Sequence, residues 1–225
     1  MSASAEPITI ELADTRVSGL LSVPPGARTC YVLAHGAGAG MAHPFMAQMA
    51  AGLAERGVAS LRYQFPYMER RAKRPDPPAL AHSTVRAAAA EAARRLPEFA
   101  LVAGGKSFGG RMTSQAQSAP PLPGVRGLAF LGFPLHPAGK PSDERARHLS
   151  DVRVPMLFLQ GSRDALADLN LLRPVVERLG ERATLRVFDD ADHSFHVPAR
   201  GGRRDADVRR ELLDTLAAWI LTVAA

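Results

Sequence analysis

Cysteine is nearly absent from this sequence of 225 residues, in which Cys30 is the only one. A single thiol forms no disulfide within the chain, and it cannot supply the clustered ligands of a cysteine-based zinc or iron–sulfur site. This scarcity fits a reducing compartment. We therefore expect a cytoplasmic protein, and the sequence implies no metal and no other cofactor.

Long apolar stretches are absent too. No run approaches the roughly 20 residues that a helix needs to cross a bilayer, and the first seven residues (MSASAEP) lack the basic region and apolar core of a signal peptide. We expect neither membrane association nor export. The content of 46% hydrophobic and 22% charged residues is typical of a globular protein. Because no repeat or linker divides the chain, the simplest expectation is one domain over residues 1–225.

Lysine is scarce as well: Lys73, Lys106 and Lys140 are the only lysines among 28 basic residues, and the formal net charge is +6. Two basic clusters, 70–74 and 200–204, could contact a polyanion. Neither has interleaved aromatic residues or belongs to a known nucleic-acid-binding module. We expect solvated surface there and no nucleic-acid partner, and nothing in the sequence indicates an oligomeric state.

Short apolar runs alternate with segments of helical spacing along the chain. Strands are expected at 8–12, 17–23, 30–34, 58–63, 99–103, 125–131, 155–160 and 183–188, and helices at 44–56, 82–96, 108–117, 168–179 and 205–221. The first two strands read as an antiparallel hairpin. The remainder predicts an α/β fold with a mainly parallel central sheet and helices on both faces. In such sheets the functional residues gather beyond the carboxyl ends of the strands.

A G-x-S-x-G motif follows one of the buried strands. Gly105-Lys106-Ser107-Phe108-Gly109 stands between the strand at 99–103 and the next helix, with further glycines at Gly104 and Gly110. A sharp strand-to-helix turn needs small residues beside its serine, because larger ones would clash with the neighbouring backbone. The motif predicts that Ser107 is a nucleophile.

A serine nucleophile needs a base, and the base needs an acid to orient it. In this type of sheet the expected chain order is serine, acid, histidine. Asp164 follows the strand at 155–160 and is the expected acid, although an aspartate there could also cap a helix. Asp168 and Asp192 are its competitors.

The corresponding histidine follows the last predicted strand. His193 lies just beyond the strand at 183–188 and is the expected base, with His196 as second choice. The other five histidines precede Asp164 and cannot keep the expected order.

Acyl transfer also needs two backbone N–H donors for the developing oxyanion. One is expected from Phe108, directly after the nucleophile. The other is expected from the small-residue loop His35–Gly40 after the strand at 30–34, where Ala37 is our choice and Gly38 the alternative.

Together these motifs resemble the α/β-hydrolase superfamily over nearly the whole chain. The segments 33–38 (LAHGAG), 65–68 (FPYM), 104–111 (GGKSFGGR), 132–141 (GFPLHPAGKP) and 160–164 (QGSRD) are similar to those of a small lidless branch. That branch holds bacterial hydrolases near the dienelactone hydrolases, a testis-expressed eukaryotic protein and a histone-acetyltransferase complex subunit. The resemblance implies Ser107, Asp164 and His193 as the triad and names no substrate.

Two loops at the carboxyl edge could line a substrate pocket or pack on the core. The pocket residues expected from them and from the turns already described are Gly38, Phe65, Tyr67, Lys106, Pro134 and His136. Lys106 and Arg111 could meet an anionic substrate group or be paired structurally. Only about two dozen residues separate the strands at 125–131 and 155–160, too few for an inserted lid domain.

The sequence thus predicts a serine hydrolase that cleaves a small ester, lactone or thioester through an acyl-enzyme. A binding or scaffold protein with the same fold is the first alternative. The second is a nucleotide-binding phosphate loop at 100–107, which would need a buried strand at 93–99 despite Arg94, Arg95 and Pro97.

Overall fold

The computed structural model describes residues 5–199 and 202–225. Its strands are β1 (Glu6–Glu11), β2 (Arg16–Ser22), β3 (Thr29–Ala34), β4 (Ala59–Tyr63), β5 (Ala100–Lys106), β6 (Val125–Leu131), β7 (Met156–Gly161) and β8 (Ala183–Phe188). Its helices are α1 (Pro44–Ala54), α2 (Pro66–Glu69), α3 (Pro78–Arg95), α4 (Phe108–Ser118), α5 (Leu169–Leu179) and α6 (Asp205–Ala224), with 3-10 helices η1 (Glu144–Asp151) and η2 (Gly180–Arg182).

The eight strands form one sheet in the order β1-β2-β4-β3-β5-β6-β7-β8. The β1–β2 hairpin is antiparallel and joins β4 in antiparallel fashion, whereas all pairs from β4 to β8 are parallel. The central strand β3 is buried along its whole length, as expected for a strand covered on both faces. The predicted fold class is confirmed.

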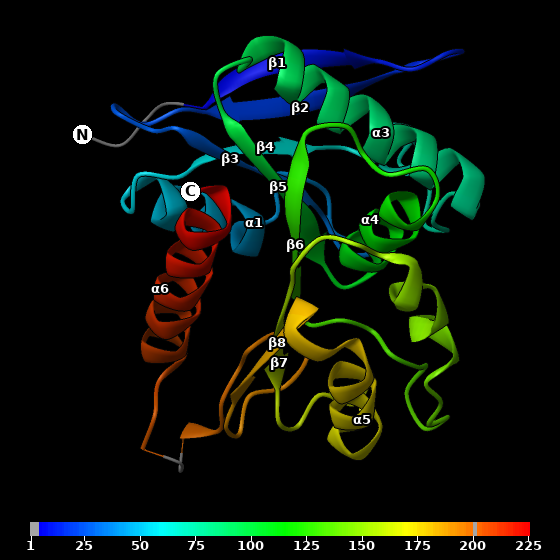
Figure 1. The fold of residues 1–225 in the computed structure, drawn as a ribbon, viewed down its shortest axis with the longest axis vertical. Helices are drawn as coiled ribbons and strands as arrows, with labels where there is room; N and C mark the ends of the chain where they lie inside the picture. The colour runs from blue at the N-terminus through cyan, green and yellow to red at the C-terminus, as the bar shows by residue number, and fades with distance from the viewer. Residues whose placement is uncertain (1–4, 200–201) are drawn as a thin grey trace.

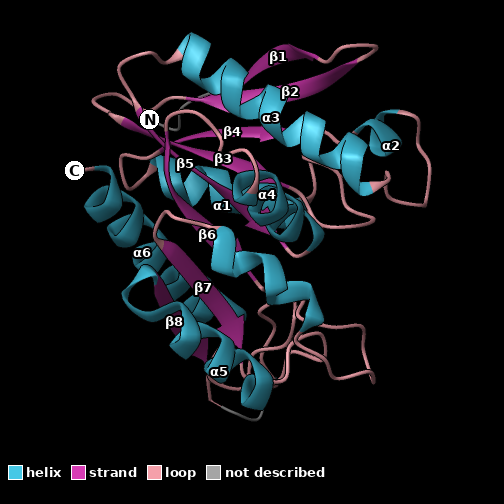
Figure 2. Ribbon diagram, turned by 45° about the vertical axis from the view of Figure 1, so that its right-hand side comes forward, coloured by secondary structure: helices cyan, strands magenta, loops and turns pink. Residues whose placement is uncertain are grey.

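Helices cover both faces of the sheet (Figures 1 and 2). The α1 and α6 helices pack on one face through residues such as Met49, Leu53, Leu212 and Leu216. The α3, α4 and α5 helices supply the core on the other face. No helix in the described part of the chain is long and apolar enough to cross a membrane.

Most expected elements occur within a few residues of their predicted ends. The α3 helix begins at Pro78 rather than at 82, because proline is accepted in a first helical turn, where no N–H partner is needed. The α2 and η1 helices were not expected. Within the described residues, only η1 forms a helix between β6 and β7, so no lid domain is inserted there.

The phosphate-loop alternative is wrong. Residues 100–106, which would have to form the loop, are the central strand β5, and residues 93–95 end the α3 helix instead of forming a strand. Backbone N–H groups that pair with neighbouring strands cannot cradle a phosphate.

The two basic clusters contain residues that form ion pairs within the protein. In the first, Arg70 pairs with the buried carboxylate of Asp76 at 2.8 Å. In the second, Arg203 pairs with Glu211 at 2.5 Å, and Arg200 lies outside the described residues.

Candidate active site

Ser107 stands in a sharp turn between β5 and α4, with backbone angles φ 49° and ψ −117°. A non-glycine residue is strained in this region, and such strain concentrates at functional sites. Close packing around the turn explains its glycines. A Cβ on Gly105 would overlap the carbonyl oxygen of Ala34, and one on Gly109 would lie 2.5 Å from that of His35. The turn therefore presents the serine at the carboxyl edge of the sheet while its neighbours pack tightly.

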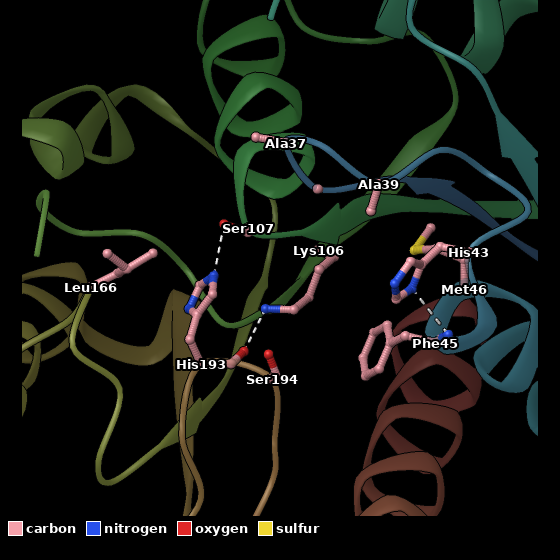
Figure 3. Close-up of a pocket in the computed structure, with 11 residues that line it drawn as sticks. Ala37, Ala39, His43, Phe45, Met46, Lys106, Ser107, Leu166, His193 and Ser194 are labelled. Atoms are coloured by element: carbon pink, nitrogen blue, oxygen red, sulfur yellow. Dashed lines mark hydrogen bonds between the residues drawn. The ribbon is translucent and has the colours of Figure 1, made fainter. Parts of the chain in front are cut away.

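Ser107, His193 and Asp164 form a continuous chain of contacts. The Ser107 Oγ lies 2.8 Å from Nε2 of His193, and the Nδ1 of that ring lies 2.7 Å from Oδ2 of Asp164. Figure 3 shows the imidazole turned toward Ser107. With the ring proton on Nδ1 donated to the carboxylate, Nε2 is free to accept the hydroxyl proton.

Asp164 is buried, with 5% of its surface exposed, and its carboxylate is held from three sides. Besides contacting His193, it accepts a hydrogen bond from the Leu166 N–H at 2.8 Å and one from the side-chain amide of Gln160. The amide oxygen of Gln160 accepts in turn from the Phe133 N–H at 2.9 Å. Gln160 therefore ties the carboxylate to the loop after β6.

The competing residues are engaged elsewhere. Asp168 caps α5 by accepting from the Asn170 N–H. Asp192 accepts from the backbone N–H groups of Ser194 and His196. The ring of His196 is exposed and faces Asp205 at 2.9 Å, away from Ser107.

The loop after β3 runs beside the nucleophile. Phe108 is the first residue of α4, so its N–H has no partner within the helix. The Ala37 N–H makes no backbone hydrogen bond among the described residues, and Ala37 lines the cavity next to Ser107. The Gly38 N–H instead donates to the Tyr67 hydroxyl at 3.2 Å, so of the two candidates Ala37 keeps the free donor.

His35 and Tyr67 hold this loop in place. The buried His35 ring bonds through Nδ1 to Gly36 O at 2.8 Å and through Nε2 to the Phe65 N–H at 3.1 Å. Because its Nε2 must accept, the ring is neutral. Burial lowers the pKa of His35 to about 4, which keeps it neutral at physiological pH.

A cavity of about 420 Å³ opens beside Ser107 (Figure 3). It is lined by Gly36, Ala37, Ala39, His43, Phe45, Met46, Lys106, Ser107, Leu166, His193 and Ser194. Most of these side chains are small or apolar, which suits a small organic substrate. Among the described residues, no group of three or more histidine, cysteine or acidic side chains could hold a metal ion.

Of the six expected pocket residues, only Lys106 lines this cavity. Phe65 and Tyr67 are fully buried and pack against Phe108, and Tyr67 also contacts the loop after β3. Gly38 and Pro134 are absent from the lining. The buried His136 accepts from the Asp168 N–H through Nε2, which fixes the loop that carries Asp164.

A sequence model described as an α/β-hydrolase domain matches residues 27–221. The chain belongs to the α/β-hydrolase family. This match agrees with the sheet order and with the strand–serine–helix turn, and the resemblance stated from the motifs is confirmed.

Solved structures of other α/β hydrolases share this fold. A dienelactone hydrolase from Anabaena variabilis superimposes with a TM-score of 0.80 at 18% identity, covering 100% of both chains. A lidless α/β serine hydrolase from Xanthomonas campestris superimposes with a TM-score of 0.74 at 22% identity, and the match covers 97% of this chain and 96% of the other chain. The esterase domain of a Rhodothermus marinus protein superimposes with a TM-score of 0.74 at 17% identity, and the match covers 96% of this chain and 97% of the other chain.

Three supporting residues of this α/β hydrolase escaped the sequence analysis. His35 was set aside because it precedes Asp164 in the chain, and His136 was expected only as a pocket residue. The sequence around each histidine does not show which loop its ring holds in place. Gln160 had a visible signal: it is a polar residue at the end of an otherwise apolar strand, MLFLQG. A buried amide at that point needs partners, and Asp164 and Phe133 supply them.

Proposed function

We propose that this α/β hydrolase is a serine hydrolase that cleaves a small ester, lactone or thioester through a covalent acyl-enzyme. The observation that carries the proposal is the contact chain from Ser107 through His193 to Asp164, at 2.8 and 2.7 Å, beside a cavity of about 420 Å³. The strained backbone of Ser107 supports it, because such strain aims a nucleophile at its substrate.

The proposed reaction has two halves. His193 Nε2 removes the hydroxyl proton of Ser107 as its oxygen attacks the substrate carbonyl, and the N–H groups of Phe108 and Ala37 stabilise the oxyanion. When the carbonyl re-forms, the bond to the leaving group breaks and His193 returns the proton to that group. Water then attacks the acyl-enzyme, His193 again acting as base, which releases the acid and restores Ser107. Asp164 holds the imidazole tautomer throughout.

The size and openness of the site favour small substrates. With no lid inserted between β6 and β7 in the described chain, little protein surface covers a long acyl chain. The relatives described as a dienelactone hydrolase and as an esterase act on carboxylic esters or lactones by name, which supports the same bond class here. We further propose one domain over residues 1–225, with a small molecule as its substrate, acting in the cytoplasm.

Labelling with a fluorophosphonate tests the nucleophile directly. We expect one adduct on Ser107 in the wild-type protein, located by peptide mass mapping. Ser107→Ala should abolish the adduct and His193→Ala should slow its formation by at least about a hundredfold, because the hydroxyl loses its base.

His196→Ala is the matched control, since it removes a nearby exposed imidazole that contacts Asp205. It should label at the wild-type rate. A folded wild-type protein that neither labels nor hydrolyses a simple aryl ester would overturn the proposal in favour of a binding or scaffold protein.

A further inference from the structure

Lys106 brings a positive charge into the cavity. It directly precedes Ser107, and its side chain runs along the cavity wall to donate a hydrogen bond from Nζ to the carbonyl oxygen of His193 at 2.6 Å (Figure 3). The same nitrogen lies 5.7 Å from the centre of the Phe195 ring. It also lies close to Gly132, where an added Cβ would stand 3.1 Å from Nζ. The ammonium group therefore lies beside His193 at the cavity wall, close to the proposed reaction centre.

This ammonium has no carboxylate partner. Among the described residues it forms no ion pair and only one hydrogen bond, although it carries three N–H groups. Asp164 directs its oxygens to His193, Gln160 and the Leu166 N–H. A cation drawn out of water without a counter-ion is unfavourable. Burial lowers the pKa of Lys106 to about 8, while the more distant Asp164 and Asp192 raise it.

The rest of the cavity leaves this charge uncompensated. Ala37, Ala39, Phe45, Met46 and Leu166 are apolar, and no acidic side chain is among the lining residues. Such walls exclude water and strengthen any electrostatic attraction within them. The missing negative charge is therefore best supplied by the ligand.

Resting on the proposed function, we propose that the preferred substrate is an ester that carries a carboxylate a few bonds from its scissile carbonyl, and that Lys106 binds this carboxylate. Nζ of Lys106 and Oγ of Ser107 contact the backbone oxygen and the ring of the same residue, His193. The carboxylate and the reacting carbonyl are therefore separated by about the span of one residue, which a short acyl chain bridges.

Binding to the Ser107→Ala protein tests this substrate class without relying on turnover. The probes are the monomethyl esters of succinic, glutaric and adipic acids, each paired with the neutral primary amide of the same length. We expect at least one half-ester to bind about tenfold more tightly than its amide by calorimetry, the gain typical of a charge-assisted hydrogen bond. Equal binding, or no binding of any half-ester, overturns the proposal.

Two substitutions on the same background separate binding from support of the His193 loop. Lys106→Gln keeps a hydrogen-bond donor but no charge, whereas Lys106→Met removes both. The preference for the half-ester should disappear in each, with folding checked by circular dichroism. Lys73 is exposed, and Lys73→Met makes the same change in net charge, so this control variant should keep the preference for the half-ester. A preference that survives in both Lys106 variants overturns the proposal.

Failure of this proposal can be told apart from failure of the proposed function. Fluorophosphonate labelling of Ser107 in the wild-type protein reports on the nucleophile alone. Labelling without any carboxylate preference leaves the serine hydrolase in place and removes the role of Lys106 in binding.

Discussion

At the scale of single residues, the site depends on side chains that never touch the substrate. Gln160, His35 and His136 each connect two loops of the carboxyl edge through buried hydrogen bonds. Such bonds contribute little net stability, but breaking one leaves a buried group without a partner, which costs about 1–3 kcal/mol. They also fix the orientation of the proposed triad.

Replacing Gln160 should lower both the reactivity of Ser107 and the stability of the fold. Gln160→Leu keeps the size of the side chain but removes the amide that contacts Asp164, so the carboxylate loses one of its restraints. We expect the rate of fluorophosphonate labelling at Ser107 to fall about tenfold, the equivalent of one such hydrogen bond. Labelling rate and melting temperature are measured together.

The control makes the same chemical change outside the site. Gln115 lies on α4 and contacts His82, so Gln115→Leu should label at the wild-type rate. If Gln160→Leu also labels at the wild-type rate, Gln160 does not position the triad.

At the scale of elements, α4 and the end of β3 approach each other closely. Gly109 lies in the first turn of this helix, and its missing side chain lets the helix approach His35 O and Ala34. The contact places the first turn of α4 beside the loop after β3. The two proposed oxyanion donors, the N–H groups of Phe108 and Ala37, lie on these two segments, so their relative position depends on the contact.

Gly109→Ala should force these two elements apart. Its Cβ would stand 2.5 Å from His35 O and 2.7 Å from the Cβ of Ala34. Overpacking of this kind costs more than the helix propensity that alanine adds, so we expect the free energy of unfolding to fall by about 2 kcal/mol. Urea denaturation measures the change.

Gly139→Ala separates this clash from backbone strain. Gly139 has φ 71° with no atom within 4 Å of an added Cβ, so only the left-handed backbone is penalised, by about 1 kcal/mol. If Gly109→Ala and Gly139→Ala lower the free energy of unfolding equally, the close approach of α4 to the end of β3 contributes nothing beyond the ordinary cost of replacing a glycine.

The elements also show how far the sequence could be interpreted. Buried parallel strands are apolar runs and the half-buried hairpin strands alternate in polarity, so all eight were predictable. The carboxyl-edge rule placed Ser107, Asp164 and His193 within reach of one another. The short α2 helix was not predictable, because one turn carries no periodicity. Phe65, which caps this helix, and Tyr67 within it turn into the core and pack against Phe108. The sequence spacing alone does not reveal that these side chains point inward.

At the scale of the whole molecule, two neutral histidines, the buried His35 and the half-buried His148, make stability depend on pH. Burial lowers the pKa of His35 and of His148 to about 4, and the nearby Arg111 and His82 lower that of His148 further. Both histidines bind protons more readily in the unfolded chain, where the pKa is about 6.5. Their contribution to stability is therefore complete above pH 6.5 and is lost as the pH falls toward 4.

His148→Gln should make this acid destabilisation shallower. Glutamine can still contact the Ser114 hydroxyl, which lies 2.8 Å from His148 Nε2, but it takes up no proton. Between pH 6.5 and 4.5 the variant should lose about 2 kcal/mol less of its free energy of unfolding than the wild-type protein. Parallel curves for wild type and His148→Gln would contradict the prediction.

The contact between Ser107 and His193 joins positions 86 residues apart in the chain. During synthesis the serine turn and its supporting helix emerge long before the imidazole that would activate them. A nascent or prematurely terminated chain that ends before β8 lacks His193, so under the proposed mechanism the Ser107 hydroxyl stays inert until β8 and the residues after it have been made.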